Sequence, residues 1–262
     1  MHRKLLVMAT IMAIMLVGAP YAQAITFGQP DGTLHPNVGT MIVEFPNGNT
    51  YLWCSGSLIA PDVFLTAAHC TNSLVGYGVA PDKVWVTFDP VADENATLLH
   101  GIYVVNPGYG HDMHDLHDVA VVLLDTPVED ITPAQLPTAG LLDQMKEDHT
   151  LREQTFVAVG YGTVRDDKTK GPQAFVDNNE RRYVEQSVLA LKPGWIQFSM
   201  NPSTGNGGTC YGDSGGPHFL DDSNVVVSVT VTGDYPCRAT DVTYRLDTES
   251  ARAYLSQFVE LP

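Results

Sequence analysis

Short segments rich in β-branched and aromatic residues, each bounded by turn residues, recur along most of the chain and constrain its fold more than any other feature. They lie at residues 38–45, 57–59, 64–67, 84–88, 98–105, 119–124, 155–159, 183–189, 195–199, 225–232 and 242–246. Runs of this length and spacing are typical of antiparallel β-barrels and sandwiches. The 23 glycines and 17 prolines suit the tight turns that such a fold needs. The sequence therefore predicts an all-β protein.

One helix and one domain boundary are also predicted. Residues 249–259 form an amphipathic pattern that Asp247 or Thr248 can cap, and its apolar side holds Ala251, Leu255, Phe258 and Val259. The β-type pattern is weaker from 126 to 149, and a boundary between 132 and 154 leaves two β units of similar size. We therefore expect an N-terminal domain at 25–140 and a C-terminal domain at 141–262.

The N-terminus has the composition of a secretory signal peptide. His-Arg-Lys at 2–4 precedes an apolar run at 5–19 that is too short to span a bilayer comfortably, and Ala-Gln-Ala at 22–24 is a small-x-small cleavage pattern. We expect residues 1–24 to be removed, so that the mature chain starts at Ile25, is secreted and has no membrane association. An N-terminal membrane anchor is the alternative, because the apolar run is long for a leader.

Net charge and cysteine content limit which partners the protein can bind and what its cysteines can do. A formal net charge of -16 makes attraction to nucleic acid or anionic lipid improbable. Four cysteines in an exported chain suggest two disulfides. Local pairing would close one loop in each half, each loop contributing about 3 kcal/mol to stability. A zinc site is the competing interpretation, but the Cys and His residues lack suitable spacing. The cysteines are Cys54, Cys70, Cys210 and Cys237.

Three segments carry the residue types of nucleophilic catalysis. In the segment 212–217, Gly-Asp-Ser-Gly-Gly-Pro, glycines on both sides of Ser214 permit a sharp turn and close approach of a substrate. A serine needs a base to take its proton and a third group to orient that base. His69 follows an apolar strand and precedes a cysteine, and Asp118 stands at the start of a strongly apolar strand. These are the candidate base and orienting carboxylate.

In this order, His69, Asp118 and Ser214 with their flanking residues resemble the trypsin/chymotrypsin family of secreted serine endopeptidases over essentially the whole mature chain. Subtilisins and α/β-hydrolases have other orders. The resemblance implies two six-stranded antiparallel β-barrels packed face to face, with a C-terminal helix. It places His69 and Asp118 in the first barrel and Ser214 in the second. It also implies the disulfides Cys54–Cys70 and Cys210–Cys237.

The resemblance further implies the role of each residue. Ser214 would attack the peptide carbonyl, His69 would accept and return the proton, and Asp118 would orient His69. A neutral imidazole is needed for this, so activity should fall below about pH 7. The backbone N–H groups of Gly212 and Ser214 would form the oxyanion hole. In this family an Ile-led N-terminus pairs with the Asp before the nucleophile, which predicts an ion pair between Ile25 and Asp213.

The substrate pocket is predicted by counting back from Ser214. This places Gly208 at the base, Thr209 beside it and Tyr211 at the rim, with no acid where trypsin has its Asp. Gly233 ends the Val-Thr-Gly stretch that replaces the family's Ser-Trp-Gly, and Asp241 falls on the opposite wall. A small base favours apolar or aromatic side chains slightly over basic ones, which Asp241 would attract.

No cofactor or metal is expected to be required. Asp89, Asp93 and Glu94 lie where trypsins carry a calcium loop, so Ca²⁺ remains an alternative. The His- and Asp-rich residues 111–118 are interpreted as a solvated loop. The expected partners are protein or peptide substrates, and the expected state is a monomer.

Two other functions compete with an endopeptidase. Gly-x-Ser-x-Gly at 212–216 also fits the nucleophile elbow of esterases and lipases, which requires a helix after the serine and a distant downstream histidine. An inactive, protease-like binding protein is the other alternative. Such a protein usually lacks one of the three residues, whereas all three are present here.

Overall fold

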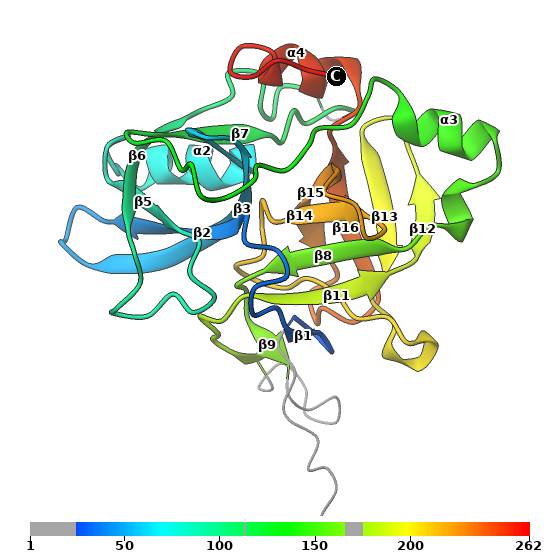
Figure 1. Cartoon of the computed structure of the whole chain (residues 1–262), viewed down its shortest axis with the longest axis horizontal. Helices are drawn as coiled ribbons and strands as arrows, with labels where there is room; N and C mark the ends of the chain where they lie inside the picture. Colours follow the sequence, from blue (N-terminus) through cyan, green and yellow to red (C-terminus); the bar gives the residue numbers. More distant parts are fainter. Residues whose placement is uncertain (1–24, 113, 166–174) are drawn as a thin grey trace, which may run out of the picture.

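The structure is a computed structural model that describes residues 25–112, 114–165 and 175–262. It contains two β units side by side, with the C-terminal helix above them (Figure 1). The predicted signal peptide at 1–24 lies outside the described residues. Within the described part, no helix is both long and apolar enough to cross a bilayer.

The first unit is a closed six-stranded barrel with the strand order β2-β3-β4-β7-β6-β5. Alternating side chains turn inward: Val84 and Val86 are fully buried, whereas Trp85 between them is half-buried. The strands are β2 (Val38–Glu44), β3 (Thr50–Ala60), β4 (Val63–Thr66), β5 (Val84–Thr87), β6 (Leu99–Val104) and β7 (Ala120–Leu124). This barrel matches the expectation.

The second unit is an eight-stranded sheet with the order β1-β11-β8-β14-β15-β16-β13-β12. β11 and β12 are separated only by Ser187, so they form one bent strand that joins the two sides of a half-barrel. Counted in this way, the unit has the expected six strands plus the short edge strand β1. Its strands are β1 (Gln29–Pro30), β8 (Phe156–Gly160), β11 (Arg182–Gln186), β12 (Val188–Leu191), β13 (Trp195–Ser199), β14 (Pro217–Leu220), β15 (Val226–Gly233) and β16 (Thr240–Arg245).

Because β1 pairs with β11, the N-terminal segment lies against the second unit. The described residues also contain a small two-stranded ribbon, β9 (Val164–Arg165) with β10 (Phe175–Val176), and two 3₁₀ helices, η1 (Leu151–Glu153) and η3 (Pro202–Thr204).

The predicted C-terminal helix is present as α4 (Glu249–Leu255), with Thr248 as its cap, but it ends four residues before the predicted end at 259. The hydroxyl of Thr248 accepts a hydrogen bond from the backbone N–H of Ala251. Two further helices, α2 (Ala68–Gly76) and α3 (Leu141–Glu147), were not predicted. Both are short, and α3 buries only Leu142 completely, so neither carries a long periodic apolar stripe.

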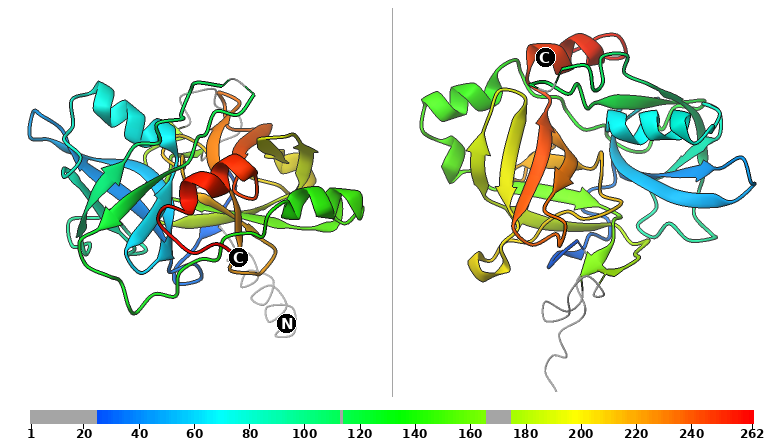
Figure 2. Two further views of the ribbon diagram at one scale, coloured as in Figure 1. Left: turned by 90° about the horizontal axis from the view of Figure 1, so that it is seen from above. Right: turned by 180° about the vertical axis from the view of Figure 1, so that it is seen from behind.

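A shared core joins the two units. It combines side chains of the first barrel, the second sheet and α4, which lies over the junction when viewed from above (Figure 2). Members from these three sources include Leu65, Val121, Val159, Val229 and Leu255. The all-β, two-unit fold class with a C-terminal helix is therefore confirmed, and the residues discussed next lie close to this junction.

Candidate active site

Asp118 lies just before β7 and is held from both sides. The side-chain amide of Asn106 donates to the carbonyl oxygen of His117 at 3.1 Å and to that of Val119 at 3.0 Å. Only 1% of the Asp118 side chain is exposed. The Asn106 side chain thus fixes the backbone on both sides of Asp118. Both carboxylate oxygens of Asp118 contact the same residue.

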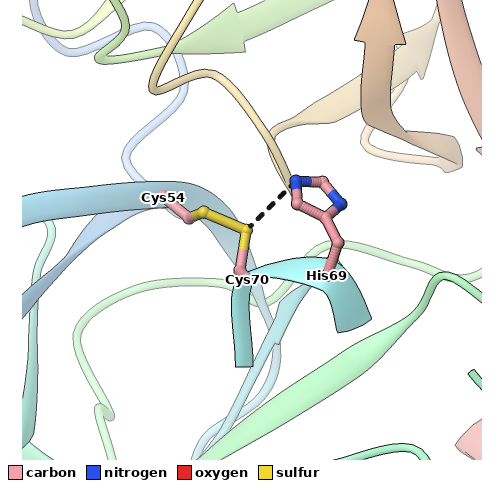
Figure 3. A group of neighbouring side chains, drawn as sticks. All are labelled: Cys54, His69 and Cys70. Atoms are coloured by element: carbon pink, nitrogen blue, oxygen red, sulfur yellow. Dashed lines mark hydrogen bonds between the residues drawn. A yellow bond between two sulfur atoms is a disulfide. The ribbon is translucent and has the colours of Figure 1, made fainter. Parts of the chain in front are cut away.

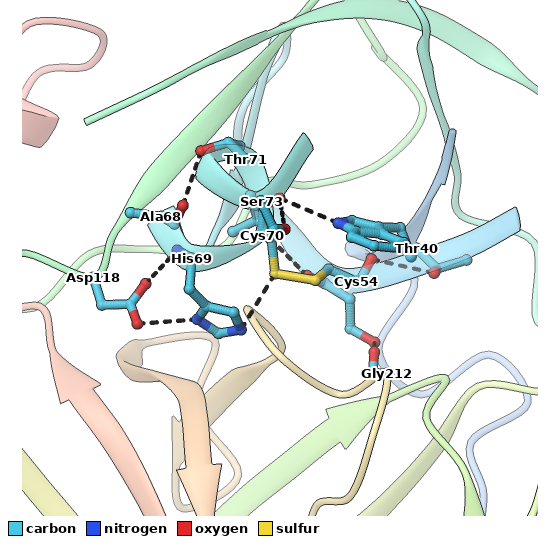
Figure 4. Close-up of a disulfide and its surroundings, with 12 residues drawn as sticks. Thr40, Cys54, Ala68, His69, Cys70, Thr71, Ser73, Asp118 and Gly212 are labelled. Atoms are coloured by element: carbon cyan, nitrogen blue, oxygen red, sulfur yellow. Dashed lines mark hydrogen bonds and ion pairs between the residues drawn. A yellow bond between two sulfur atoms is a disulfide. The ribbon is translucent and has the colours of Figure 1, made fainter. Parts of the chain in front are cut away.

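That residue is His69, the second residue of α2. Backbone N–H groups in the first turn of a helix have no partner within the helix. Asp118 supplies one: its Oδ1 accepts from the backbone N–H of His69 at 2.8 Å, and its Oδ2 lies 3.0 Å from Nδ1 of the ring (Figure 4). When Nδ1 is the donor, Nε2 keeps the lone pair that a general base needs. The His69 side chain remains 27% exposed.

A disulfide anchors this helix end. Cys70, the residue after His69, is bonded to Cys54 on β3, and the indole N–H of Trp53 donates to the Cys70 carbonyl at 3.1 Å. The Cys70 Sγ lies 3.7 Å from Nε2 of His69 (Figure 3). Cys54, His69 and Cys70 bring three potential metal-ligand atoms together, but the two sulfurs are bonded to each other and provide no thiolates. This group therefore does not support a zinc site.

The second disulfide joins Cys210, near Ser214, to Cys237. Both expected pairs are therefore present. With no free cysteine in the chain, the zinc alternative is wrong.

The Ser214 loop approaches the first barrel directly before His69. Gly212 and Gly215 have φ angles of 95° and 78°, which side chains larger than hydrogen rarely adopt. A Cβ atom on Gly215 would lie 2.2 Å from Thr66 Oγ1 and 2.7 Å from the backbone nitrogen of Ala67. The structure thus brings the loop to the start of α2. In the described part of the chain, no hydrogen bond joins Ser214 to His69.

Two backbone donors in this loop are available. The N–H groups of Asp213, Gly215 and Gly216 all donate to carbonyl oxygens. In contrast, the N–H groups of Gly212 and Ser214 have no acceptor among the described residues. The Gly212 carbonyl is held by the backbone N–H and the hydroxyl of Ser55, at 3.1 and 2.9 Å. These two N–H groups are therefore open to an acceptor that does not belong to the described residues.

Asp213 is a fully buried carboxylate without a cationic partner in the described part of the chain. It accepts hydrogen bonds from the backbone N–H groups of Gly162, at 2.7 Å, and Cys210, at 2.8 Å. Burial raises the pKa of Asp213 to about 7, against the lowering effect of these bonds, and the charge of Asp241 adds to the rise. A positive charge nearby would reverse this effect.

Ile25 lies in the same region of the second unit. Its side chain is 1% exposed and packs with Ala158 and Val184. Ala158 and Gly160 are two residues apart on β8, so they share a face of the strand. A Cβ atom on Gly160 would lie 2.2 Å from Oδ1 of Asp213. Ile25 and Asp213 thus contact the same strand, although no direct bond joins them.

A cavity of about 320 Å³ opens beside Ser214. Thr209, Tyr211 and Gly233 line it as expected, but Gly208 and Asp241 do not. The predicted position of Asp241 on the pocket wall is corrected by its burial: it is 0% exposed.

Asp241 is instead engaged with other buried side chains. Its Oδ2 accepts from Nε2 of Gln186 at 3.0 Å and lies 3.6 Å from Nε2 of His218. Burial lowers the pKa of His218, against the opposing charge of Asp241. The other oxygen of Asp241, Oδ1, is also buried and has no hydrogen-bond partner among the described residues.

The loop considered for calcium does not gather its carboxylates. Asp89 Oδ2 accepts from the backbone N–H of Thr97, and Asp93 Oδ1 accepts from that of Asn95. Among the described residues of this loop, no three His, Cys, Asp or Glu side chains bring their ligand atoms together, and Glu94 does not join Asp89 and Asp93 in such a group. These residues do not fit a calcium site.

Asn106 and Ser55 were missed by sequence reasoning. Asn106 precedes Pro107 and Gly108, a pattern that predicts only a turn, and Ser55 lies inside β3. Their partners are more than ten residues away or on the other unit, and no local pattern specifies such contacts.

Comparisons with known proteins match most of the chain to one family. The family described as Trypsin matches residues 34–253. Mouse kallikrein 1-related peptidase b27 is 27% identical over 210 residues, which are 72% of this chain and 73% of that protein. Human kallikrein-5 is 24% identical over 196 residues, 71% of this chain and 60% of that protein. A solved structure described as HL collagenase covers 89% of this chain and 97% of its own, with a TM-score of 0.66 and 20% identity, a likeness of fold alone.

Proposed function

Because the chain belongs to the trypsin family, we propose that it is a secreted serine endopeptidase that hydrolyses peptide bonds through an acyl-enzyme. The observation that carries this proposal is the double contact of Asp118 with the backbone and ring of His69. It is made at a helix end that the Ser214 loop contacts through Gly215.

The proposed chemistry assigns one role to each group. Ser214 Oγ attacks the substrate carbonyl while Nε2 of His69 takes the hydroxyl proton. The same proton passes to the leaving amine, and water then hydrolyses the ester. Asp118 holds Nδ1 and stabilises the imidazolium. For proton transfer, Nε2 must come within hydrogen-bond distance of Oγ, a contact that often tightens only when substrate binds.

The free N–H groups of Gly212 and Ser214 support an oxyanion hole. Their proposed role is to stabilise the negative charge that develops on the carbonyl oxygen. Losing one such donor typically costs on the order of a hundredfold or more in rate.

Removal of residues 1–24 is proposed to complete the site. In the full chain, the nitrogen of Ile25 is a peptide nitrogen. After cleavage it would become an ammonium that can pair with Asp213, whose buried carboxylate is otherwise without a cation among the described residues. The strand β8, which both residues contact, supports this pairing. N-terminal sequencing of active, secreted protein should return Ile-Thr-Phe-Gly, and any other start would refute this step.

The esterase alternative requires a helix after the serine. Here Ser214 is followed by β14, in an all-β fold, so this context is missing. We therefore expect peptide substrates rather than lipid esters, with the chain acting as a monomer.

A fluorophosphonate probe on mature protein tests the proposal. Ser214 should be labelled, and the label should disappear in Ser214→Ala but persist in Ser256→Ala, a control at an exposed serine that ends α4. Labelled protein should cleave peptides. Folded protein that resists the probe yet binds peptides would instead be a non-catalytic binding protein, and cleavage of lipid esters alone would indicate an esterase.

A further inference from the structure

Asp118 is the central residue of a tight turn, and the residue before it has an unusual backbone conformation. The backbone N–H of Val119 donates to the carbonyl oxygen of His117 at 2.9 Å, which closes a three-residue γ-turn around Asp118. His117 has a φ angle of 52°, in the left-handed region that residues with a side chain adopt at a cost in free energy. A conformation of this kind persists where surrounding contacts impose it.

Two side chains hold His117 from its two backbone groups. Its N–H donates to Oδ1 of Asp115 at 3.1 Å, and its carbonyl oxygen accepts from the side-chain amide of Asn106 at 3.1 Å. The same amide nitrogen donates to the carbonyl oxygen of Val119 at 3.0 Å, so it binds both residues that flank Asp118. Rotation of the backbone on either side of Asp118 would break at least one of these bonds.

The amide group of Asn106 is fully used by these contacts. Asn106 lies two residues after β6 and is 9% exposed. Its Nδ2 has two hydrogens for the two carbonyl oxygens, and its Oδ1 accepts from the backbone N–H of Gly108 at 2.9 Å. An aspartate of the same shape would bring an acceptor-only oxygen against two carbonyl oxygens. The bonds to the turn therefore depend on the chemistry of the amide and not on the shape of the side chain.

On the basis of the proposed endopeptidase activity, we propose that Asn106 is a positioning residue of the reaction. It holds the turn at 117–119 so that Asp118 contacts both the backbone and the ring of His69 (Figure 4). These two contacts, at 2.8 and 3.0 Å, use both carboxylate oxygens and so require one orientation of the side chain. Loss of the amide would release the turn and move the carboxylate, and a displacement of about 1 Å can cost a hundredfold in rate.

The first test makes the same chemical change at two buried asparagines. Asn106→Asp removes the donors to the turn, and Asn37→Asp is the matched control, because Asn37 is 3% exposed and its Nδ2 donates to Oδ1 of Asn224 at 2.7 Å. In mature protein, Asn106→Asp should lower kcat at least about tenfold and change KM less than about twofold, whereas Asn37→Asp should change neither. A wild-type kcat in Asn106→Asp, or an equal loss of kcat in both variants, would overturn the assignment.

The second test follows the contact between His69 and Asp118 without any catalysis. A strong hydrogen bond to a carboxylate deshields the Nδ1–H proton of His69, so this proton should give a ¹H NMR signal at unusually low field in Ser214→Ala protein. Adding Asn37→Asp should leave the signal in place. Adding Asn106→Asp should move it to higher field or abolish it. An unchanged signal in the Asn106→Asp protein, or no signal in the Ser214→Ala parent, would contradict the proposed role.

His117→Val disturbs the same turn by another route and replaces Asn106→Asp should that variant not fold. A φ of 52° is an outlier for a β-branched residue, so His117→Val should also lose kcat and the low-field signal. His149→Val is its control, because His149 has a φ angle of 61° in the loop after α3, and should keep both. An unchanged signal with Ser214 still labelled by the fluorophosphonate refutes the role of Asn106 alone. Absence of labelling refutes the endopeptidase proposal, and the signal then still tests how Asp118 is held.

Discussion

Tyr244 of the second sheet donates a 2.6 Å hydrogen bond to Oδ1 of Asp115, three residues before Asp118 on the first unit. The hydroxyl of Ser250, in α4, binds the other oxygen of the same carboxylate. The segment that carries Asp118 is therefore attached to the second sheet and to the C-terminal helix. The position of the candidate orienting acid depends on contacts from both halves of the molecule.

Tyr244→Phe should separate this positioning from simple packing, because it keeps the ring and removes only the hydrogen bonds of the hydroxyl to Asp115 and Ser250. We expect a loss of about 1 kcal/mol in stability and a fall in kcat of several-fold with KM unchanged, since Asp118 would orient His69 less well. Steady-state kinetics and thermal unfolding measure the two effects. Tyr77→Phe, at an exposed ring, is the control. Loss of stability with kcat intact would show that Tyr244 only supports the fold.

The raised pKa of Asp213 predicts a pH-dependent stability of the uncleaved chain. Its folded-state pKa of about 7 exceeds the ordinary Asp value of 3.8, so the protonated form is favoured in the folded state. The associated stability is fully present below about pH 4 and is lost as pH rises through about 7. The difference corresponds to at most about 4 kcal/mol.

Asp213→Asn, in a Ser214→Ala background that prevents self-cleavage, measures this effect. Urea unfolding of the uncleaved chain gives the free energy of unfolding of the Asn variant minus that of its parent. This difference should be larger at pH 8 than at pH 4.5. The chain starting at Ile25 should show the opposite, because the Asn variant loses the proposed ammonium partner. If Asp213→Asn changed the free energy of unfolding by the same amount in the uncleaved chain and in the chain starting at Ile25, at both pH values, the Ile25–Asp213 pairing would be contradicted.

The two disulfides should affect different kinetic constants. Cys54–Cys70 fixes the helix end that carries His69, so its double alanine variant should lose mainly kcat. Cys210–Cys237 lines the cavity, so its removal should mainly raise KM and weaken discrimination between peptides. Each removal should cost about 3 kcal/mol in stability. Identical changes in kcat and KM for both variants would argue against this division.

Chelation should leave stability unchanged. Asp89 and Asp93 already accept backbone hydrogen bonds within their loop and do not converge with Glu94. Thermal unfolding of mature protein with EDTA, compared with added Ca²⁺, should give the same Tm. A rise of several degrees with Ca²⁺ would show binding to the folded state through ligands not anticipated here.

Much of the fold was predictable because β-barrels repeat a local pattern. The runs at 38–45 and 119–124 correspond to β2 and β7, and the tail helix was found through its periodicity and cap. The nine-residue α2 was missed because its stability comes from a disulfide and from Asp118 at its N-terminus, two long-range contacts.

The pocket could not be predicted in the same way. Asp241 is enclosed by Gln186, 55 positions away in sequence, and by His218 on a third strand. Met200 meets Gly208 only because a turn returns the chain after β13. Such contacts depend on how strands are placed side by side, which counting back from Ser214 does not include.

The close packing of Gly215 against Thr66 and Ala67 has one more consequence. Ser214, the proposed nucleophile, and His69, the proposed base, belong to different halves of the molecule, which meet at a residue that has a hydrogen atom where other residues carry a Cβ atom. A methyl group at Gly215 would overlap Thr66 and Ala67 and would push the two halves apart. The distance between the Ser214 loop and the start of α2 thus depends on the absence of a side chain at Gly215.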